Sequence, residues 1–388
     1  MQKKFQINES LVRIKAIAKK ETKQLSRDER MLMVIFLFPV FLLIIFGYAI
    51  NFDVHHIKIA VYDLDRSSTS RNFINSLLST DYFDLVDYLD SDKQIKKSLD
   101  ENIAQCVIVI PKNLSRELNS NRKAEIQYLI DGVAGNTATV IMNYVNIATI
   151  NYSAKLQNNF LARKGMNSFI PIQLEPRFWF NPELNSTRFL LPGLIGMILI
   201  VVAVVTIALS IVREKERGTI EQINVSPLSS TELMIGKTIP YIAIALINSA
   251  LILIAGYILF GIVIKGSIFW LTVCILVFLF ASLCLGLLVS TIAESQQVAF
   301  QIGTLISMIP SLLLSGFIFP IENMPVAIQI ITNVTPAKFF VVCLRSILLK
   351  GEGIAVFWDQ LLYMILFSLV ILAIATKRYI KNAAVQFE

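Results

Sequence analysis

Six long apolar runs occur along this chain, one near its N-terminal end and five after residue 188. They are Met31–Ile50, Phe189–Val212, Ile239–Ile264, Ile268–Ala293, Val298–Phe319 and Leu361–Thr376. A helix needs about 20 apolar residues to cross the hydrocarbon core of a bilayer. The pattern therefore predicts six transmembrane helices, the first within residues 31–52 and the other five within residues 188–388.

Residues 53–187, between the first two runs, alternate between strand-like and helix-like patterns. The predicted strands are Ile57–Asp65, Phe83–Leu89, Ala104–Ile110 and Ala124–Asp131, and the predicted helices are Thr69–Leu78, Asp92–Asn102, Leu114–Asn119 and Asn136–Asn158. Such alternation is typical of an α/β domain with a mainly parallel sheet. The predicted fold class is an α-helical polytopic membrane protein with an α/β domain inserted between helices 1 and 2.

Two further segments are too polar or too short to span. Residues 1–30 predict a basic amphipathic helix suited to the surface of an anionic leaflet; the alternative is an ordinary solvated helix. Residues 320–359 contain short apolar pieces, which predict interfacial or re-entrant helices. The apolar face expected for the first segment comprises Leu11, Ile14, Ile17, Ala18 and Leu25.

Composition and charge support a membrane protein and give it an orientation. The chain is 55% hydrophobic and 16% charged, whereas soluble domains carry about 25% charged residues. Nine Lys and Arg precede Met31 against four Asp and Glu, while residues 53–188 hold fifteen of each sign. Because basic residues stay on the cytoplasmic side, both termini and residues 213–238 are predicted to be cytoplasmic. Residues 53–187 and 320–359 are predicted to lie outside, and a nucleic-acid binder is excluded.

The strongly charged segment Arg213–Lys237 is predicted to form a helix–turn–helix platform between two spans. Arg213–Asn224 has a helical pattern, and Val225–Pro227 stops it. Ser229 then opens a second helix with Glu232 three residues later, as in a capping box. Glu214, Glu216 and Arg217 are expected to be exposed, and Gly218 to allow a bend or a close approach by another protein.

Most other candidate motifs lack residues that their chemistry requires. Ile235–Thr238 resembles the end of a phosphate-binding loop but lacks the glycine that the motif requires at Thr231, so Lys237 is interpreted as a charge at the membrane edge. Two histidines, His55 and His56, and four separated cysteines are too few and too scattered for a metal site. The remaining candidates are three aspartates, Asp63, Asp65 and Asp131. They are predicted to be turn or cap residues. The alternative is that they form a ligand site at the edge of the sheet.

The central parts of the apolar runs contain no Asp, Glu, Lys or Arg. A proton-coupled carrier usually has such a residue there, so the energy for transport would come from elsewhere. Mild polar residues could line a substrate path or could hold helices together. The candidates for a path are Asn248, Ser282, Thr304, Ser307 and Ser311.

Four stretches carry a family resemblance that covers nearly the whole chain. REKERGTIEQINVSPLSSTELMIGKTIPY resembles the cytoplasmic loop signature of permease subunits of ATP-binding-cassette exporters of the ABC-2 type. VYDLDRSSTSR, LIDGVAGNTA and FWFNPELNSTRFLLPGLIG follow the order found in the bacterial multidrug-export permeases with a large extracytoplasmic domain. One departure is Ile223-Asn224-Val225, where relatives are usually more apolar.

The resemblance implies a transport subunit of the bacterial inner membrane rather than an enzyme. A separate ATPase subunit would bind ATP and Mg and dock on the platform. A second permease chain would complete the pore, and a periplasmic membrane-fusion adaptor and an outer-membrane channel would take the amphiphilic drug-like or lipid-like substrate onward. The residues that match the docking signature are Arg213, Glu214, Glu216, Arg217, Gly218, Thr219, Glu221 and Gln222.

Two other classes of function remain as alternatives. A membrane receptor could sense a ligand through residues 53–187, but receptors usually add a cytoplasmic output domain and only a dozen residues follow the last run. A membrane-embedded enzyme would need a catalytic constellation, and the motifs above supply none.

Overall fold

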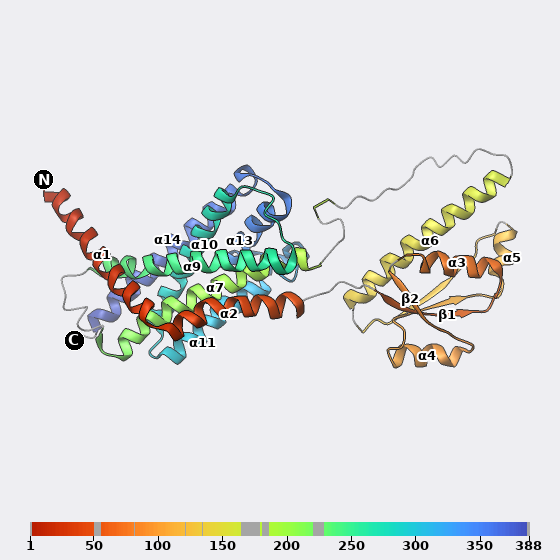
Figure 1. Cartoon of the computed structure of the whole chain (residues 1–388), viewed down its shortest axis with the longest axis horizontal. Coiled ribbons are helices and arrows are strands. Elements are labelled where there is room, and N and C mark those ends of the chain that lie inside the picture. Colours follow the sequence, from red (N-terminus) through yellow and green to blue (C-terminus); the bar gives the residue numbers. More distant parts are fainter. Residues whose placement is uncertain are drawn as a thin grey trace. The chain divides into compact units, whose positions relative to one another are not determined.

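The computed structural model describes residues 2–49, 56–80, 82–120, 122–133, 135–163, 179–180, 186–219 and 229–385. The chain forms two compact units. Met1–Asn51 and Phe178–Glu388 form the first, called the helical unit here, and Phe52–Arg177 forms the second, called the sheet unit. Figure 1 shows the elements of each unit.

The sheet unit contains the predicted mainly parallel sheet. Its strands are β1 (Ile57–Asp63), β2 (Phe83–Tyr88), β3 (Cys106–Ile110) and β4 (Gln127–Ile130), in the order β2-β1-β3-β4. β1 pairs in parallel with both neighbours, and β4 runs antiparallel at one edge. The helices are α3 (Ser68–Leu78), α4 (Asp92–Asp100), α5 (Leu114–Asn119) and α6 (Gly135–Arg163).

Alternation along the strands explains why this sheet has two covered faces. Ile57, Ile59 and Val61 of β1 point into a core with α3 and α6, whereas Ala60 points into a smaller core with Ile95 of α4. Successive side chains of a strand point to opposite faces, so one strand supplies both cores. α3 and α6 therefore cover one face and α4 the other (Figure 1).

The helical unit is built from long apolar helices and several short ones. Its long helices are α1 (Gln2–Arg27), α2 (Glu29–Ala49), α7 (Ser186–Glu216), α9 (Ser230–Phe260), α10 (Ile268–Ile292), α11 (Gln296–Leu313) and α14 (Ile354–Val385). Between α11 and α14 lie η1 (Ile321–Asn323), α12 (Val326–Ile331), η2 (Thr332–Val334), α13 (Pro336–Arg345) and η3 (Ser346–Lys350).

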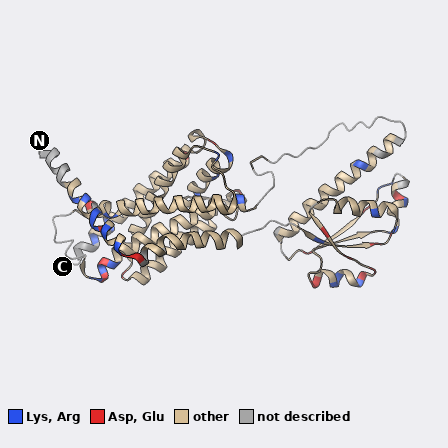
Figure 2. Cartoon of the chain, viewed as in Figure 1, with Lys and Arg blue, Asp and Glu red and all other residues tan. Residues whose placement is uncertain are grey.

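Within the described residues, four helices are long and apolar enough to span a membrane: α7, α9, α10 and α14. Val326–Val334 and Pro336–Lys350 form a pair bent by 93°, which is either a broken span or the re-entrant loop expected here, so the number of candidate spans is four or five. The apolar part of α2, Ile35–Ala49, is shorter. Charged residues are sparse along these helices; most gather at the end of the unit that holds α1, and a few Lys and Arg lie at the other end (Figure 2).

α7 is the central helix of this unit. In its most apolar 18-residue window 83% of residues are buried, compared with 28% in α9 and 22% in α14. Gly286 of α10 lets α10 approach α7 closely, because a Cβ added at this position would lie 2.5 Å from the carbonyl oxygen of Val204 in α7. α9 and α14 therefore present apolar outer faces, as lipid-facing helices do.

Candidate functional site

The last turn of α7 joins five other parts of the helical unit through four consecutive side chains. Arg213 pairs with Asp28, between α1 and α2, at 3.2 Å. Lys215 donates to the carbonyl oxygen of Ser290 near the end of α10, and the Glu216 carboxylate accepts from the backbone N–H of Gln296 of α11 at 2.7 Å. We call this group, together with the contacts of Glu214, the α7 junction.

Glu214 lies in the buried core of the junction. Its Oε2 is 2.7 Å from Nζ of Lys237 in α9, and its Oε1 accepts from Nζ of Lys20 in α1 at 2.8 Å. Nζ of Lys237 also lies 3.5 Å from Oε1 of Glu21 in α1, which accepts from Ser210 at 2.6 Å. Two lysines thus balance two carboxylates, which is the condition under which buried charges are tolerated.

This charge cluster is shielded from solvent. The Lys237 side chain is 2% exposed, Glu21 4% and Glu214 6%, while Lys20 reaches out to 53%. At short range in such surroundings opposite charges attract more strongly than in water. The cluster therefore ties α1, α7 and α9 together.

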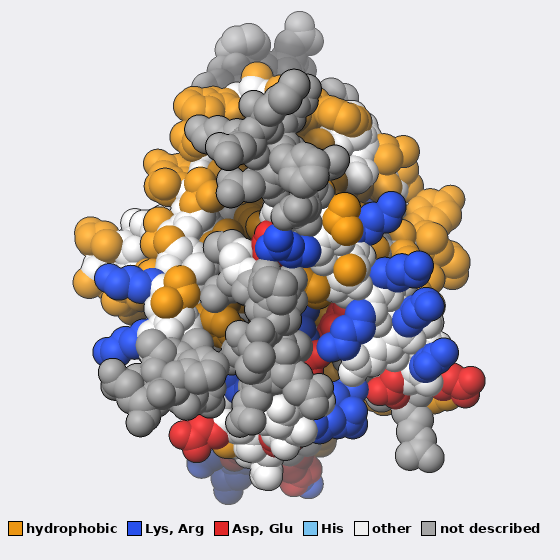
Figure 3. All heavy atoms as spheres, turned by 90° about the vertical axis from the view of Figure 1, so that its left-hand side faces the viewer, with side chains coloured by type: hydrophobic (Ala, Val, Ile, Leu, Met, Phe, Trp, Pro, Cys, Tyr) orange, Lys and Arg blue, Asp and Glu red, His pale blue; other side chains and the backbone are white. Residues whose placement is uncertain are grey.

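α1 can reach the cluster because α9 carries a glycine where the two helices meet. A Cβ added at Gly236 would lie 2.8 Å from Cβ of Ile17 and 3.2 Å from the carbonyl oxygen of Ile14. Ile17 and Leu25 of α1 are buried on the same face as Glu21, at spacings of four residues. The exposed side of α1 carries lysines, and Figure 3 shows Lys and Arg side chains gathered on this face of the molecule.

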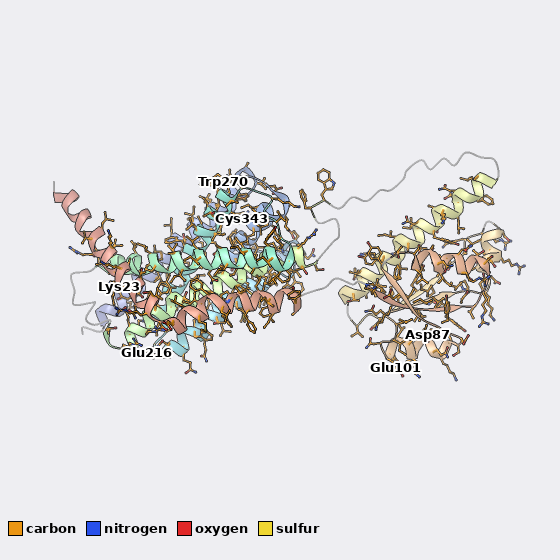
Figure 4. The ribbon with its side chains drawn as sticks, viewed as in Figure 1. Lys23, Asp87, Glu101, Glu216, Trp270 and Cys343 are labelled. Carbon is orange, nitrogen blue, oxygen red and sulfur yellow. The ribbon has the colours of Figure 1, made fainter. Side chains whose placement is uncertain are left out.

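The chain leaves the junction through exposed residues. Glu216, Arg217 and Gly218 are exposed, and Gly218 has φ +67°, a conformation that favours glycine and ends α7. Thr219 is helical again, and its hydroxyl donates to the carbonyl oxygen of Glu214 at 3.2 Å. Figure 4 labels Glu216 at the same end of the unit as Lys23 of α1.

The predicted capping box at the start of α9 is confirmed. The Ser229 hydroxyl accepts from the backbone N–H of Glu232 at 3.2 Å, and the Glu232 carboxylate accepts from the backbone N–H of Ser229 at 2.9 Å. Arg13 of α1 lies 3.8 Å from the same carboxylate. The predicted docking residues Glu221 and Gln222, and the segment Ile223–Val225, lie outside the described residues.

Two expectations about the platform are wrong. Arg213 does not begin a separate helix, because α7 continues unbroken from Ser186 to Glu216. Glu214 is buried rather than exposed, because α1 and α9 cover its side chain. Lys237, interpreted as a charge at the membrane edge, is buried as the partner of Glu214, which a local pattern does not report.

The sequence reasoning also missed residues of the junction, namely Lys20, Glu21, Ser210 and Lys215. Glu21 left a signal: it falls midway between Ile17 and Leu25 on an otherwise apolar stripe. A charge in such a stripe indicates a buried partner of opposite sign. Nothing in the sequence pairs that position with Lys237, 216 residues away.

Several other candidates have local roles. Ile235–Thr238 is part of helix α9 and so is not a phosphate-binding loop. The turn roles expected of Asp63 and Asp131 are confirmed, because Asp63 accepts from the backbone N–H of Arg66 and Asp131 from that of Val133. Asp65 instead accepts from the backbone N–H of Ser115 in the first turn of α5, 50 residues away in the chain. Among the described residues no three His, Cys, Asp or Glu side chains gather into a possible metal site.

The five candidate path residues have different surroundings. Ser282 and Ser307 donate to carbonyl oxygens one turn earlier in their own helices. Asn248 of α9 donates to the carbonyl oxygen of Ile35 in α2 at 3.2 Å, which is a helix–helix contact. The hydroxyls of Thr304 and Ser311 are buried with no hydrogen-bond partner among the described residues. Their role in a substrate path stays a prediction.

Comparison with known proteins gives a match over most of the chain. Residues 30–377 match the family described as ABC-2 family transporter protein. The Escherichia coli (strain K12) protein named "Probable multidrug ABC transporter permease YbhS" is 31% identical over 356 residues, which cover 91% of this chain and 93% of that protein. YbhR of the same strain, with the same description, is 30% identical over 349 residues, covering 90% and 93%. "Inner membrane transport permease YhhJ" is 29% identical over 330 residues, covering 84% and 85%.

Proposed function

The chain belongs to the ABC-2 family of transporter proteins, and from that premise we propose that it is the permease subunit of an ATP-driven exporter. It is a multi-pass membrane protein and a transport subunit rather than an enzyme. Membership of an ABC transporter family implies an ATPase partner and a dimeric arrangement.

The observation that carries the proposal is the α7 junction. Residues 217–229 connect the last turn of α7 to the start of α9, and the buried Glu214–Lys237 ion pair holds the last turn of α7 against the second turn of α9 at 2.7 Å. A force applied to the exposed segment would therefore move α7 and α9 jointly. Lys20 and Glu21 carry the movement to α1, and Lys215 and Glu216 carry it to α10 and α11.

The proposed cycle needs no titratable group in the membrane. A separate ATPase subunit holds ATP and Mg and docks on the exposed part of Arg213–Gln222, which begins at Glu216, and nucleotide binding draws the docking segments of two permease chains together. Each chain then shifts between two packings of its helices, biased by the partner's nucleotide state. The shift opens a path past Asn248, Ser282, Thr304, Ser307 and Ser311.

The finer assignments belong to the same proposal. The chain has six spans, with both termini in the cytoplasm of a bacterium and the sheet unit outside the inner membrane. It exports amphiphilic drug-like or lipid-like molecules, which the word multidrug in the names of YbhS and YbhR supports. A membrane-fusion adaptor and an outer-membrane channel receive the substrate, and α1 lies at the cytoplasmic membrane surface.

The test is cross-linking in the native host followed by affinity purification of the full-length chain. An ATPase subunit should be recovered, and its ATP hydrolysis should change when the permease is added in nanodiscs. Glu216→Lys combined with Gly218→Pro should abolish both, because the first breaks the contact with Gln296 and the second forbids φ +67°. The exposed Lys112→Glu in the sheet unit is the control. Normal ATPase recovery and export by the double variant would refute the proposal.

A further inference from the structure

A cavity of about 350 Å³ lies in the helical unit, away from the α7 junction. It is formed by the first half of α7, the last turns of α9, the connection from α9 to α10, and η3. Its volume falls within the range of about 300–1,000 Å³ that is typical of small-ligand sites. Its lining is mostly apolar and includes Leu191, Ile195, Leu253, Tyr257, Ile262 and Leu348.

The cavity opens on the outer face of α9. Ile254, Tyr257 and Val263 all contribute to its lining, and they are 55%, 59% and 57% exposed. α9 is exposed along much of its apolar length, as its 28% burial shows. In a membrane this face contacts acyl chains, so the cavity opens into hydrocarbon.

A basic corner lies at one end of this cavity. Lys265 directly follows the lining residue Ile264, is exposed, and makes no ion pair with any described residue. Gly351 packs against Lys265, because a Cβ added at Gly351 would lie 3.3 Å from Cβ of Lys265. The backbone next to Lys350 therefore lies beside Lys265. Lys350 is partly neutralised by Glu352, 3.8 Å away.

Aromatic side chains indicate that this corner lies at the level of the lipid headgroups. Phe269 and Trp270, four and five residues after Lys265, form an edge-to-face pair with ring centroids 5.2 Å apart. Tryptophan is enriched where a membrane meets water. Figure 4 shows Trp270 at the margin of the helical unit, far from Lys23 and Glu216.

We propose that this cavity binds one acyl chain of an anionic phospholipid, whose phosphate contacts Lys265. A hollow with an apolar lining suits a single flexible chain, whereas a second copy of this protein would present a broad helix face. The unpaired lysine supplies the charge that a phosphate requires. The inference rests on the membrane placement of the helical unit and not on export or on an ATPase.

The two parts of the site contribute differently to affinity. Lipid tails are as apolar as the lining, so filling the cavity gains little over the bilayer. Preference for one lipid over another therefore depends on the headgroup and on Lys265. The chain should discriminate phosphatidylglycerol from phosphatidylcholine with the same acyl chains.

The experiment is native mass spectrometry of the full-length chain titrated with these two lipids. We expect phosphatidylglycerol to bind the wild type about tenfold more tightly, a difference of about 1.4 kcal/mol, and Lys265→Gln to remove the preference. Gly256→Leu should weaken binding of both lipids, because its side chain projects into the cavity. Of the part of the chain that the structure describes, an added Cβ there meets only Leu191, at an ordinary 3.5 Å, so the variant should fold.

Two matched substitutions in the sheet unit serve as controls and should leave lipid binding unchanged. Lys112→Gln removes an exposed lysine, and Gly135→Leu adds a side chain where no atom of the residues that the structure describes lies within 4 Å. Equal affinity of the wild type for both lipids, or an unchanged preference in Lys265→Gln, would overturn the proposal. So would efficient disulfide cross-linking of two chains through Ile254→Cys in membranes, since a second copy would then cover the opening.

Discussion

Removing the Lys237 charge is the sharpest perturbation of the α7 junction. In Lys237→Met the side chain keeps its approximate length but leaves Glu21 and Glu214 with one cation, Lys20, between them. Oε1 of Glu21 keeps the Ser210 hydroxyl as a donor, and its Oε2 has no hydrogen-bond partner among the described residues. The cluster then holds one uncompensated negative charge.

The expected cost follows from the burial of these groups. Lys237 is 2% exposed and Glu21 is 4% exposed, so water cannot replace the lost contact. Breaking a buried ion pair by removing one partner typically costs about 3–5 kcal/mol. We expect Lys237→Met to lower the free energy of unfolding of the helical unit by an amount in that range.

A second substitution separates charge balance from packing. Lys237→Met combined with Glu21→Gln restores neutrality, because Glu214 keeps its contact with Lys20 at 2.8 Å. Replacing a buried pair by uncharged groups of similar volume is often nearly neutral. The double variant should therefore recover most of the stability that the single variant loses.

The assay is unfolding of the purified full-length chain in mixed detergent micelles, monitored by tryptophan fluorescence. Lys377→Met is the matched control, because Lys377 is exposed on α14 near the same end of the unit. A loss below about 1 kcal/mol in Lys237→Met, the range of exposed pairs, would refute the buried-cluster argument. So would a double variant that is no more stable than the single one.

Three further predictions address packing and titration. Gly236→Leu should detach α1 and make it sensitive to protease, because even a Cβ would lie 2.8 Å from Cβ of Ile17; Ile17→Gly in the same chain removes that Cβ and should partly restore protection. Gly286→Ala should cost about 1–3 kcal/mol through its contact with the α7 backbone, whereas Gly303→Ala, with ordinary contacts from 3.4 Å, should be nearly neutral. Burial raises the pKa of Cys106 from 9.0 to about 12, so its thiolate population at pH 8 falls about a thousandfold. Maleimide labelling at Cys106, read by peptide mass spectrometry, should be negligible in the native chain, should rise with pH beyond 9, and should become rapid in denaturant.

Much of the architecture could be predicted from local patterns. The alternation along Ile57–Asp63 and the apolar Cys106–Ile110 indicated the parallel sheet, and the spacing of Ser229 and Glu232 indicated the start of α9. These signals depend on neighbours within four residues, which a sequence displays directly. Element bounds mostly agree to within a few residues, because the same local contacts end helices and strands.

The composition of the α7 junction could not be predicted in that way. Arg213–Glu216 looks like an exposed charged segment because polarity alone does not distinguish a solvated side chain from a buried, paired one. The partners of Glu214 lie on α1 and α9, and Lys20 is 194 residues away in the chain. Only the docking of three helices decides which of these charges loses its water.

By itself, the sequence determined that this protein is a multi-pass membrane protein with an inserted α/β unit, because hydrophobic runs and strand alternation are properties of the chain read in order. The tertiary structure alone decided that Lys237 and Glu214 form a buried pair, and that Leu191, Tyr257 and Leu348 surround one cavity. The physical reason is that burial belongs to surfaces brought together from distant segments. A charge or an apolar side chain acquires its role from what covers it.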